Sequence, residues 1–86
     1  MTSILNTFTA KQIERARWVQ LAPTTKALQA QQRDGGKVLA VVQNVAFMRS
    51  QCPWRTVNGA TGIGYLPVNA MVAARKALLE AVQVAK

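Results

Sequence analysis

Cationic side chains beside an indole are the groups in this chain that are best suited to binding a partner. Lys11 and Arg15 are four residues apart, and Trp18 follows three residues later. On a helix, these spacings place all three side chains on one side. Two cations beside an indole can contact phosphates and stack on a base or a sugar. The alternative is that Trp18 anchors the core, because a small domain needs its aromatic residues for burial.

More cations lie in or beside predicted turns. Two of them flank the turn 34–36, and two others flank residues 52–54. Cations on turns can follow a phosphate backbone, and each phosphate contact makes binding more sensitive to salt. Scattered, solvated charge is the alternative explanation. The predicted nucleic-acid-binding residues are Lys11, Arg15, Arg17, Trp18, Arg33, Lys37, Arg49 and Arg55.

The overall charge balance also favours an anionic partner. Eleven Lys and Arg stand against three Asp and Glu with no His, which gives a formal net charge of +8 on 86 residues. Such an excess creates a positive field that attracts anions. Without an imidazole, and with one Cys and three scattered carboxylates, one subunit cannot assemble the common acid–base pairs, nucleophile triads or zinc sites. We therefore expect no enzymatic activity, no cofactor and no metal site.

The same composition indicates a single globular domain over residues 1–86. Hydrophobic residues make up 50% of the chain and charged residues 16%, as in folded proteins. Because Cys52 is the one cysteine, no internal disulfide is possible, and we expect a reducing compartment, by default the cytoplasm. Residues 1–8 lack the pattern of a secretory signal, and the charge-free stretch 56–74 contains too many turn-forming residues for a membrane span.

Two helices are expected to carry the N-terminal cations. Thr9, with Gln12 three residues later, forms a capping box for a helix over 10–22, which Pro23 ends. A second helix is expected over 26–33, before a pair of glycines.

The middle of the chain is more ambiguous. Residues 38–49 contain four valines, and we interpret them as a buried central helix, with a strand or hairpin as the alternative. Residues 50–66 are expected to form a long connection with a short strand at 55–57. The glycines at 59, 62 and 64 suit a phosphate loop or a helix-turn-helix poorly, because their spacing matches neither nucleotide motif and glycine weakens a helix.

A final helix is predicted from Pro67 to residue 85, because proline suits the first helical position. One side of this helix carries only small residues, which permit the close approach of a second helix. Arg75 falls inside the apolar stripe, where it must reach the edge, pair with an acid or point toward an anionic ligand. The predicted dimer interface consists of Ala70, Ala74, Ala77 and Ala81. The alternative is that alanine is simply a good helix former.

These patterns predict an all-α fold, a bundle of three to four helices with a long Gly- and Pro-containing loop before the C-terminal helix. The expected function is binding of nucleic acid, in particular DNA, by a small homodimeric regulator of the kind found in phages and mobile elements. The first alternative is a protein-interaction module, an assembly subunit or inhibitor that docks on an acidic protein. The second is attachment to an anionic membrane surface through the first helix.

Overall fold

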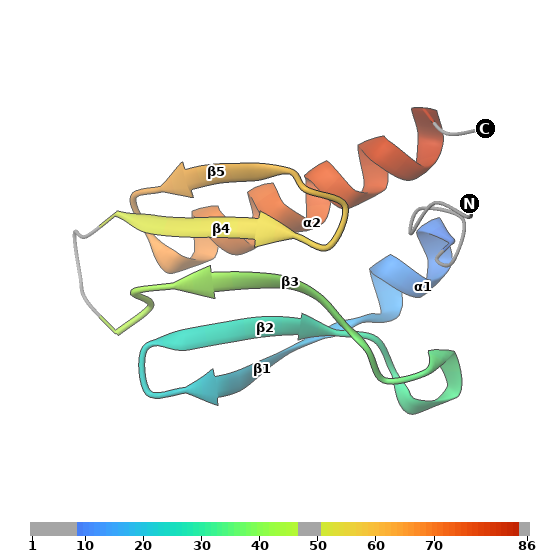
Figure 1. The fold of residues 1–86 in the computed structure, drawn as a ribbon, viewed down its shortest axis with the longest axis horizontal. Helices are drawn as coiled ribbons and strands as arrows, with labels where there is room; N and C mark the ends of the chain where they lie inside the picture. The colour runs from blue at the N-terminus through green and yellow to red at the C-terminus, as the bar shows by residue number, and fades with distance from the viewer. Residues whose placement is uncertain (1–8, 47–50, 85–86) are drawn as a thin grey trace.

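The protein consists of an antiparallel five-stranded sheet and one long helix. The computed structural model describes residues 9–46 and 51–84. The strands are hydrogen-bonded in the order β1-β2-β3-β4-β5 (Figure 1), so each strand pairs with its neighbour in sequence. The elements are α1 (Ala10–Arg15), β1 (Arg17–Ala22), β2 (Thr25–Gln29), the 3-10 turn η2 (Gln32–Asp34), β3 (Val38–Gln43), β4 (Cys52–Thr56), β5 (Thr61–Gly64) and α2 (Pro67–Val84).

The predicted all-α bundle is wrong, because three segments expected to be helical form strands. The helix expected over 10–22 stops at Arg15, and the rest of that segment is β1. Residues 26–33, also expected to be helical, supply most of β2 and the turn η2. The ambiguous segment 38–49 contributes β3, which was the alternative, and its residues 47–50 lie outside the described part of the chain.

The physical reason for this difference is strand pairing over long stretches of backbone. Trp18 lies opposite Leu28, which in turn lies opposite Ala40 on the next strand. Such cross-strand pairs stabilise a sheet and override the weak helix preference of residues such as Ala and Gln. The β-branched valines of β3 also favour a strand.

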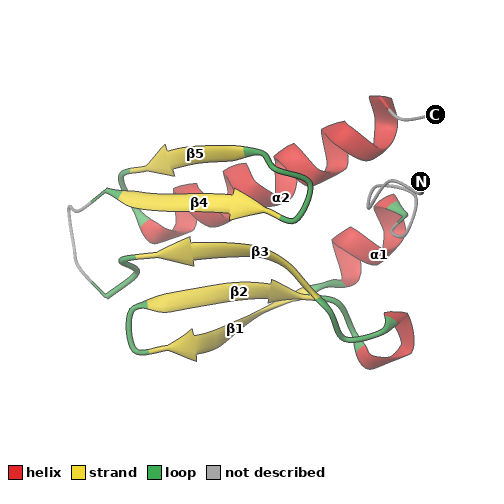
Figure 2. Cartoon of the chain, in the orientation of Figure 1, coloured by secondary structure: helices red, strands yellow, loops and turns green. Residues whose placement is uncertain are grey.

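Both ends of the described chain are helical, as the sequence predicts. Thr9 caps α1: its side chain accepts a hydrogen bond from the backbone of Gln12, and the Gln12 side chain accepts one from the Thr9 backbone. The last helix, α2, begins at Pro67. Between them, the expected long connection 50–66 is largely the hairpin of β4 and β5 (Figure 2).

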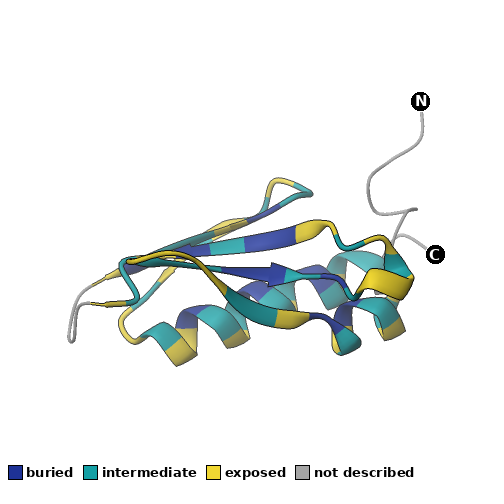
Figure 3. Cartoon of the chain, turned by 90° about the horizontal axis from the view of Figure 1, so that it is seen from below, coloured by how far each residue is buried: buried dark blue, intermediate teal, exposed yellow. Residues whose placement is uncertain are grey.

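The core lies between the sheet and the helices, on one side of the sheet only. Figure 3 shows the sheet as one layer and the helices as a second layer beneath it. α2 packs mainly against β3, β4 and β5, and α1 packs against α2. The largest fully buried side chains are Ile13, Leu28, Leu39, Val42 and Cys52. The opposite face of the sheet has no covering element among the described residues.

Glycines in β5 allow the helix and an indole to approach the sheet closely. A Cβ atom on Gly64 would lie 2.7 Å from the backbone nitrogen of Ala70 in α2. A Cβ atom on Gly62 would lie 2.4 Å from the ring of Trp54. Both distances are shorter than a carbon atom tolerates, so these positions require glycine.

We expect the substitution Gly64→Ala to destabilise the protein by about 1–3 kcal/mol, because the added methyl group meets helix backbone that cannot turn aside. Thr61→Ala, at an exposed position of the same strand, is the matched control and should change stability by less than about 0.5 kcal/mol. Urea unfolding followed by circular dichroism measures both. Equal stability of the two variants would show that α2 does not approach β5 as described.

Candidate nucleic-acid interface

The face of the sheet turned away from α2, which we call the open face, carries polar and charged side chains. Because side chains alternate along a strand, the neighbours of the core residues Trp18, Leu28 and Val42 point to the opposite side. Figure 1 views the sheet from this side, with α2 behind it. The residues of the open face include Arg17, Val19, Ala27, Gln29, Val41, Gln43, Pro53, Arg55, Thr61 and Ile63.

Four cations lie toward one end of this face, spread over β1, the β2–β3 connection and β4. Arg17 begins β1 and lies opposite Gln29 at the end of β2. Arg55 lies near the end of β4, which reaches the same end of the sheet (Figure 1). The connection between β2 and β3 is at this end too, and it holds the other two cations. We call Arg17, Arg33, Lys37 and Arg55 the basic end.

A hollow of about 350 Å³ separates Arg17 from Arg33. Gln29 lies between them and lines the same hollow. The side-chain nitrogen of Gln29 donates a hydrogen bond of 2.9 Å to the carbonyl of Gly36. This bond ties the β2–β3 connection to the sheet, so the position of Arg33 relative to Arg17 is fixed by the fold.

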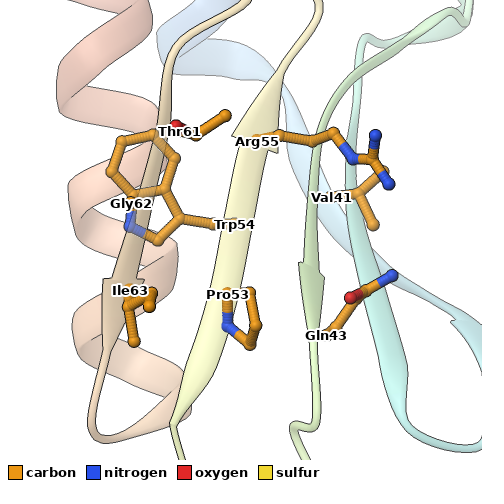
Figure 4. A pocket seen from close by; sticks show the side chains of 8 residues that line it. All are labelled: Val41, Gln43, Pro53, Trp54, Arg55, Thr61, Gly62 and Ile63. Carbon is orange, nitrogen blue, oxygen red and sulfur yellow. The ribbon is translucent and has the colours of Figure 1, made fainter.

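A second hollow, of about 460 Å³, lies over β3, β4 and β5 (Figure 4). Arg55 extends from β4 toward Val41 on β3, while the indole of Trp54 lies across β5 at Gly62. Gln43 also lines this hollow from β3, two residues beyond Val41. The hollow therefore combines a guanidinium group, an amide and apolar side chains.

The acidic residues are kept away from the open face. Asp34 lies beside Arg33 in sequence, but its carboxylate accepts hydrogen bonds of 3.0 and 3.3 Å from Nη2 of Arg15. The Asp34 side chain is only 5% exposed. Glu14 and Glu80 are on α1 and α2, in the helical layer. Among the described residues, no carboxylate belongs to the open face, and none forms an ion pair with a cation of the basic end.

The structure separates the residues that the sequence places on one helical stripe. Because α1 ends at Arg15, Trp18 belongs to β1 and packs against the core. Lys11 is exposed on α1, and Arg15 forms an ion pair with Asp34. The expected stripe of two cations and an indole is therefore absent from the helical layer. Arg49 lies outside the described residues.

The face of α2 that carries small residues packs against the rest of the same chain. Ala70 and Ala74 have no exposed surface and pack in the core beneath the sheet. Ala77 and Ala81 are half-buried. Small side chains let α2 lie close to the strands, so Ala70 and Ala74 leave no surface for the predicted dimer contact.

Arg75 forms no ion pair among the described residues and binds a backbone carbonyl instead. Its Nη2 donates a hydrogen bond of 2.7 Å to the carbonyl of Ala16, the residue that ends α1. The guanidinium group thus satisfies one of the free carbonyls at a helix end and joins α1 to α2. Its Nε is buried and has no hydrogen-bond partner among the described residues.

Arg75 also lines an apolar groove of about 380 Å³ between α2 and β1. Trp18 forms the β1 side, and Val68 and Val72 on α2 are 59% and 62% exposed. Lys76 adds a second cation to the lining. This groove lies on the helical side of the sheet, opposite to the open face.

Sequence reasoning missed Gln29 and Gln43 as surface residues of a possible site. Residues 41–43 are Val, Val and Gln, so the sequence itself does not alternate between polar and apolar there; in β3 the burial of these residues alternates, and this places Gln43 on the open face. The helix expected over 38–49 would not place side chains alternately on two faces, so the position of Gln43 was not predicted. Pairing between distant segments then places both glutamines on the same face as Arg17 and Arg55.

Comparisons of the chain with protein-family models, curated proteins and solved structures find no match. Within residues 9–46 and 51–84, no helix is long and apolar enough to cross a membrane. The same residues contain no group of three or more His, Cys, Asp or Glu side chains that could hold a metal ion. The function must therefore be inferred from the chemistry of the surfaces described above.

We expect Arg15→Met to lower the free energy of unfolding by about 1–3 kcal/mol, because it leaves the Asp34 carboxylate nearly buried and without its cation. Arg33→Met, which removes an exposed cation of the same type nearby, is the control and should change stability by less than about 0.5 kcal/mol. Urea unfolding compares the two variants. A loss for Arg33→Met as large as that for Arg15→Met would contradict the structural role of the Arg15–Asp34 pair.

Proposed function

We propose that this protein is a non-enzymatic nucleic-acid-binding protein that contacts its ligand through the open face of the sheet. The observation that carries this proposal is the placement of exposed cations along a face without carboxylates, with Arg17 and Arg33 lining one hollow and Arg55 lining another. Arg17, Arg33 and Arg55 are exposed and have no ion-pair partner among the described residues. Their guanidinium groups suit phosphate oxygens, which accept paired hydrogen bonds from Arg.

The arrangement of charge on the two sides of the molecule supports the same surface. The exposed carboxylates Glu14 and Glu80 are on the helical layer, where they would repel phosphates. A polyanion approaching the open face therefore meets cations without neighbouring carboxylates. The single Cys52 fits a role in a reducing compartment such as the cytoplasm, where nucleic acid is available.

We expect the apparent dissociation constant for a mixed-sequence DNA duplex to rise steeply with salt, because bound phosphates release counterions. Arg17→Ala, Arg33→Ala and Arg55→Ala should each weaken binding and reduce the slope of log affinity against log salt by about 1. Lys76→Ala is the matched control, since it removes one exposed cation from the helical layer. Fluorescence anisotropy from 25 to about 300 mM salt measures each slope.

Two results would refute this proposal. One is the absence of binding to any nucleic acid at low salt. The other is an equal loss of affinity for Lys76→Ala and for the three arginine variants, which would mean that net charge acts without a defined surface.

The apolar groove supports a second candidate function, contact with an acidic protein. Val68 and Val72 expose more than half of their surface beside the indole of Trp18. Arg75 and Lys76 in the same lining favour an occupant that carries carboxylates next to apolar side chains. An amphipathic helix with leucines on one side and glutamates beside them has this chemistry.

A synthetic helical peptide of that design should quench or shift the tryptophan fluorescence of the protein on binding. A peptide of the same composition with its leucines redistributed around the helix is the control. We expect Val72→Glu to weaken binding of the designed peptide at least tenfold, because the exposed valine becomes a negative charge that repels the glutamates of the peptide. Equal binding of the two peptides would exclude the groove as a specific docking site.

A further inference from the structure

The open face carries side chains that can read base edges as well as bind phosphates. Arg55 and Gln43 both line the hollow over β3, β4 and β5, with Val41 on its β3 side (Figure 4). In duplex DNA, Arg pairs with the O6 and N7 atoms of guanine, and Gln pairs with N6 and N7 of adenine. Apolar side chains contact the methyl group of thymine. These three types of side chain thus match the hydrogen-bonding groups and methyl groups that base pairs present in the major groove.

We propose that this hollow reads base pairs in the major groove of duplex DNA. This inference rests on the proposed function and adds the class of nucleic acid and the residues that select its sequence. Gln43 is exposed, and its side chain forms no hydrogen bond among the described residues, so its side-chain amide is available to a base. Arg55 is likewise exposed and without an ion-pair partner.

The position of the aromatic residues argues against a single-stranded ligand. Proteins that bind single strands stack the bases on aromatic side chains. Trp18 and Trp54 both pack against the core on the helical side of the sheet. Tyr65 is 67% exposed but follows β5, outside the strands. Among the described residues, no aromatic side chain stands on the open face, so it offers no stacking platform.

The dimensions of the strands are consistent with a groove. Neighbouring strands lie about 4.8 Å apart, so β2 and β4 are separated by about 10 Å, whereas the major groove of B-DNA is about 12 Å wide. The whole five-stranded sheet is about 19 Å across and wider than the groove, so only the middle strands can face the bases, with Val41 between them. Ala27 is fully buried beneath its neighbours and does not reach the DNA.

Three cations of the basic end, Arg17, Arg33 and Lys37, are placed to contact the rims of that groove, whereas the fourth, Arg55, lines the hollow. Arg33 and Lys37 are in the connection beyond the ends of β2 and β3. Arg17 begins β1, outside the three middle strands. Cations at these positions can meet phosphates while Gln43 and Arg55 face the bases. Phosphate contacts fix orientation and base contacts give specificity, and the two sets are spatially distinct in this protein.

The test is selection of bound duplexes from a library with a random central segment, followed by competition. We expect the wild-type protein to enrich particular base pairs, and a single strand of an enriched sequence to compete at least tenfold less well than its duplex. Gln43→Ala should abolish the preference at one or two positions and weaken binding to the enriched duplex by about 5- to 100-fold. Arg33→Gln is the contrasting variant. It should weaken all sequences alike and leave the preference unchanged.

The outcomes separate this inference from the proposed function. Equal or better competition by the single strand, or enrichment of no sequence, would overturn duplex readout while binding to nucleic acid remains. An unchanged preference in Gln43→Ala and in Arg55→Lys would overturn the assignment to this hollow. No binding to any nucleic acid would overturn both. Circular dichroism of each variant confirms that the exposed substitutions leave the fold intact.

Discussion

The close approach of α2 to one face of the sheet is the contact on which the rest of the structure depends. Gly64 and Ala70 permit this approach, because any larger side chain at Gly64 would meet helix backbone. Ala74 and Leu78 continue the contact along the helix and are almost completely buried. One helix covers one face only, so the other face of the sheet remains open, with cations and glutamines among its apolar side chains. The candidate binding surface therefore follows from the one-sided burial of the core.

The position of the few acidic residues also determines which cations remain without an ion-pair partner. Arg15 neutralises Asp34, which would otherwise place a negative charge beside Arg33. Because the Asp34 side chain is 5% exposed, this ion pair is shielded from solvent on the carboxylate side. The four cations of the basic end contribute half of the excess of +8. Arg17, Arg33, Lys37 and Arg55 lie at one end of a face that lacks carboxylates, and this arrangement is what turns a net charge into a possible binding surface.

The sequence predicts local features well and the sheet poorly, for a physical reason. The Thr9 capping box and the start of α2 at Pro67 depend on residues within one or two turns, so local patterns are sufficient to locate them. The strands depend on pairing between segments that are distant in sequence, such as β3 with β4. The helix preferences of Ala and Gln in residues 26–33 indicate a helix, and cross-strand pairing outweighs them. For the same reason, the sequence does not show that Arg17 and Arg55 share the open face, because this placement exists only after the strands have paired.

The side chains of Gln29 and Gln43, which lie on the open face, and of Val68 and Val72, which lie on the helical side, provide the most direct test. Nuclear magnetic resonance can follow the amide groups of the glutamines and the methyl groups of the valines while a mixed-sequence DNA duplex is added. If the open face binds DNA, the glutamine signals should shift in proportion to occupancy while the valine methyl signals remain unchanged. Shifts confined to Val68 and Val72 would place the ligand on the helical side and contradict the proposed surface.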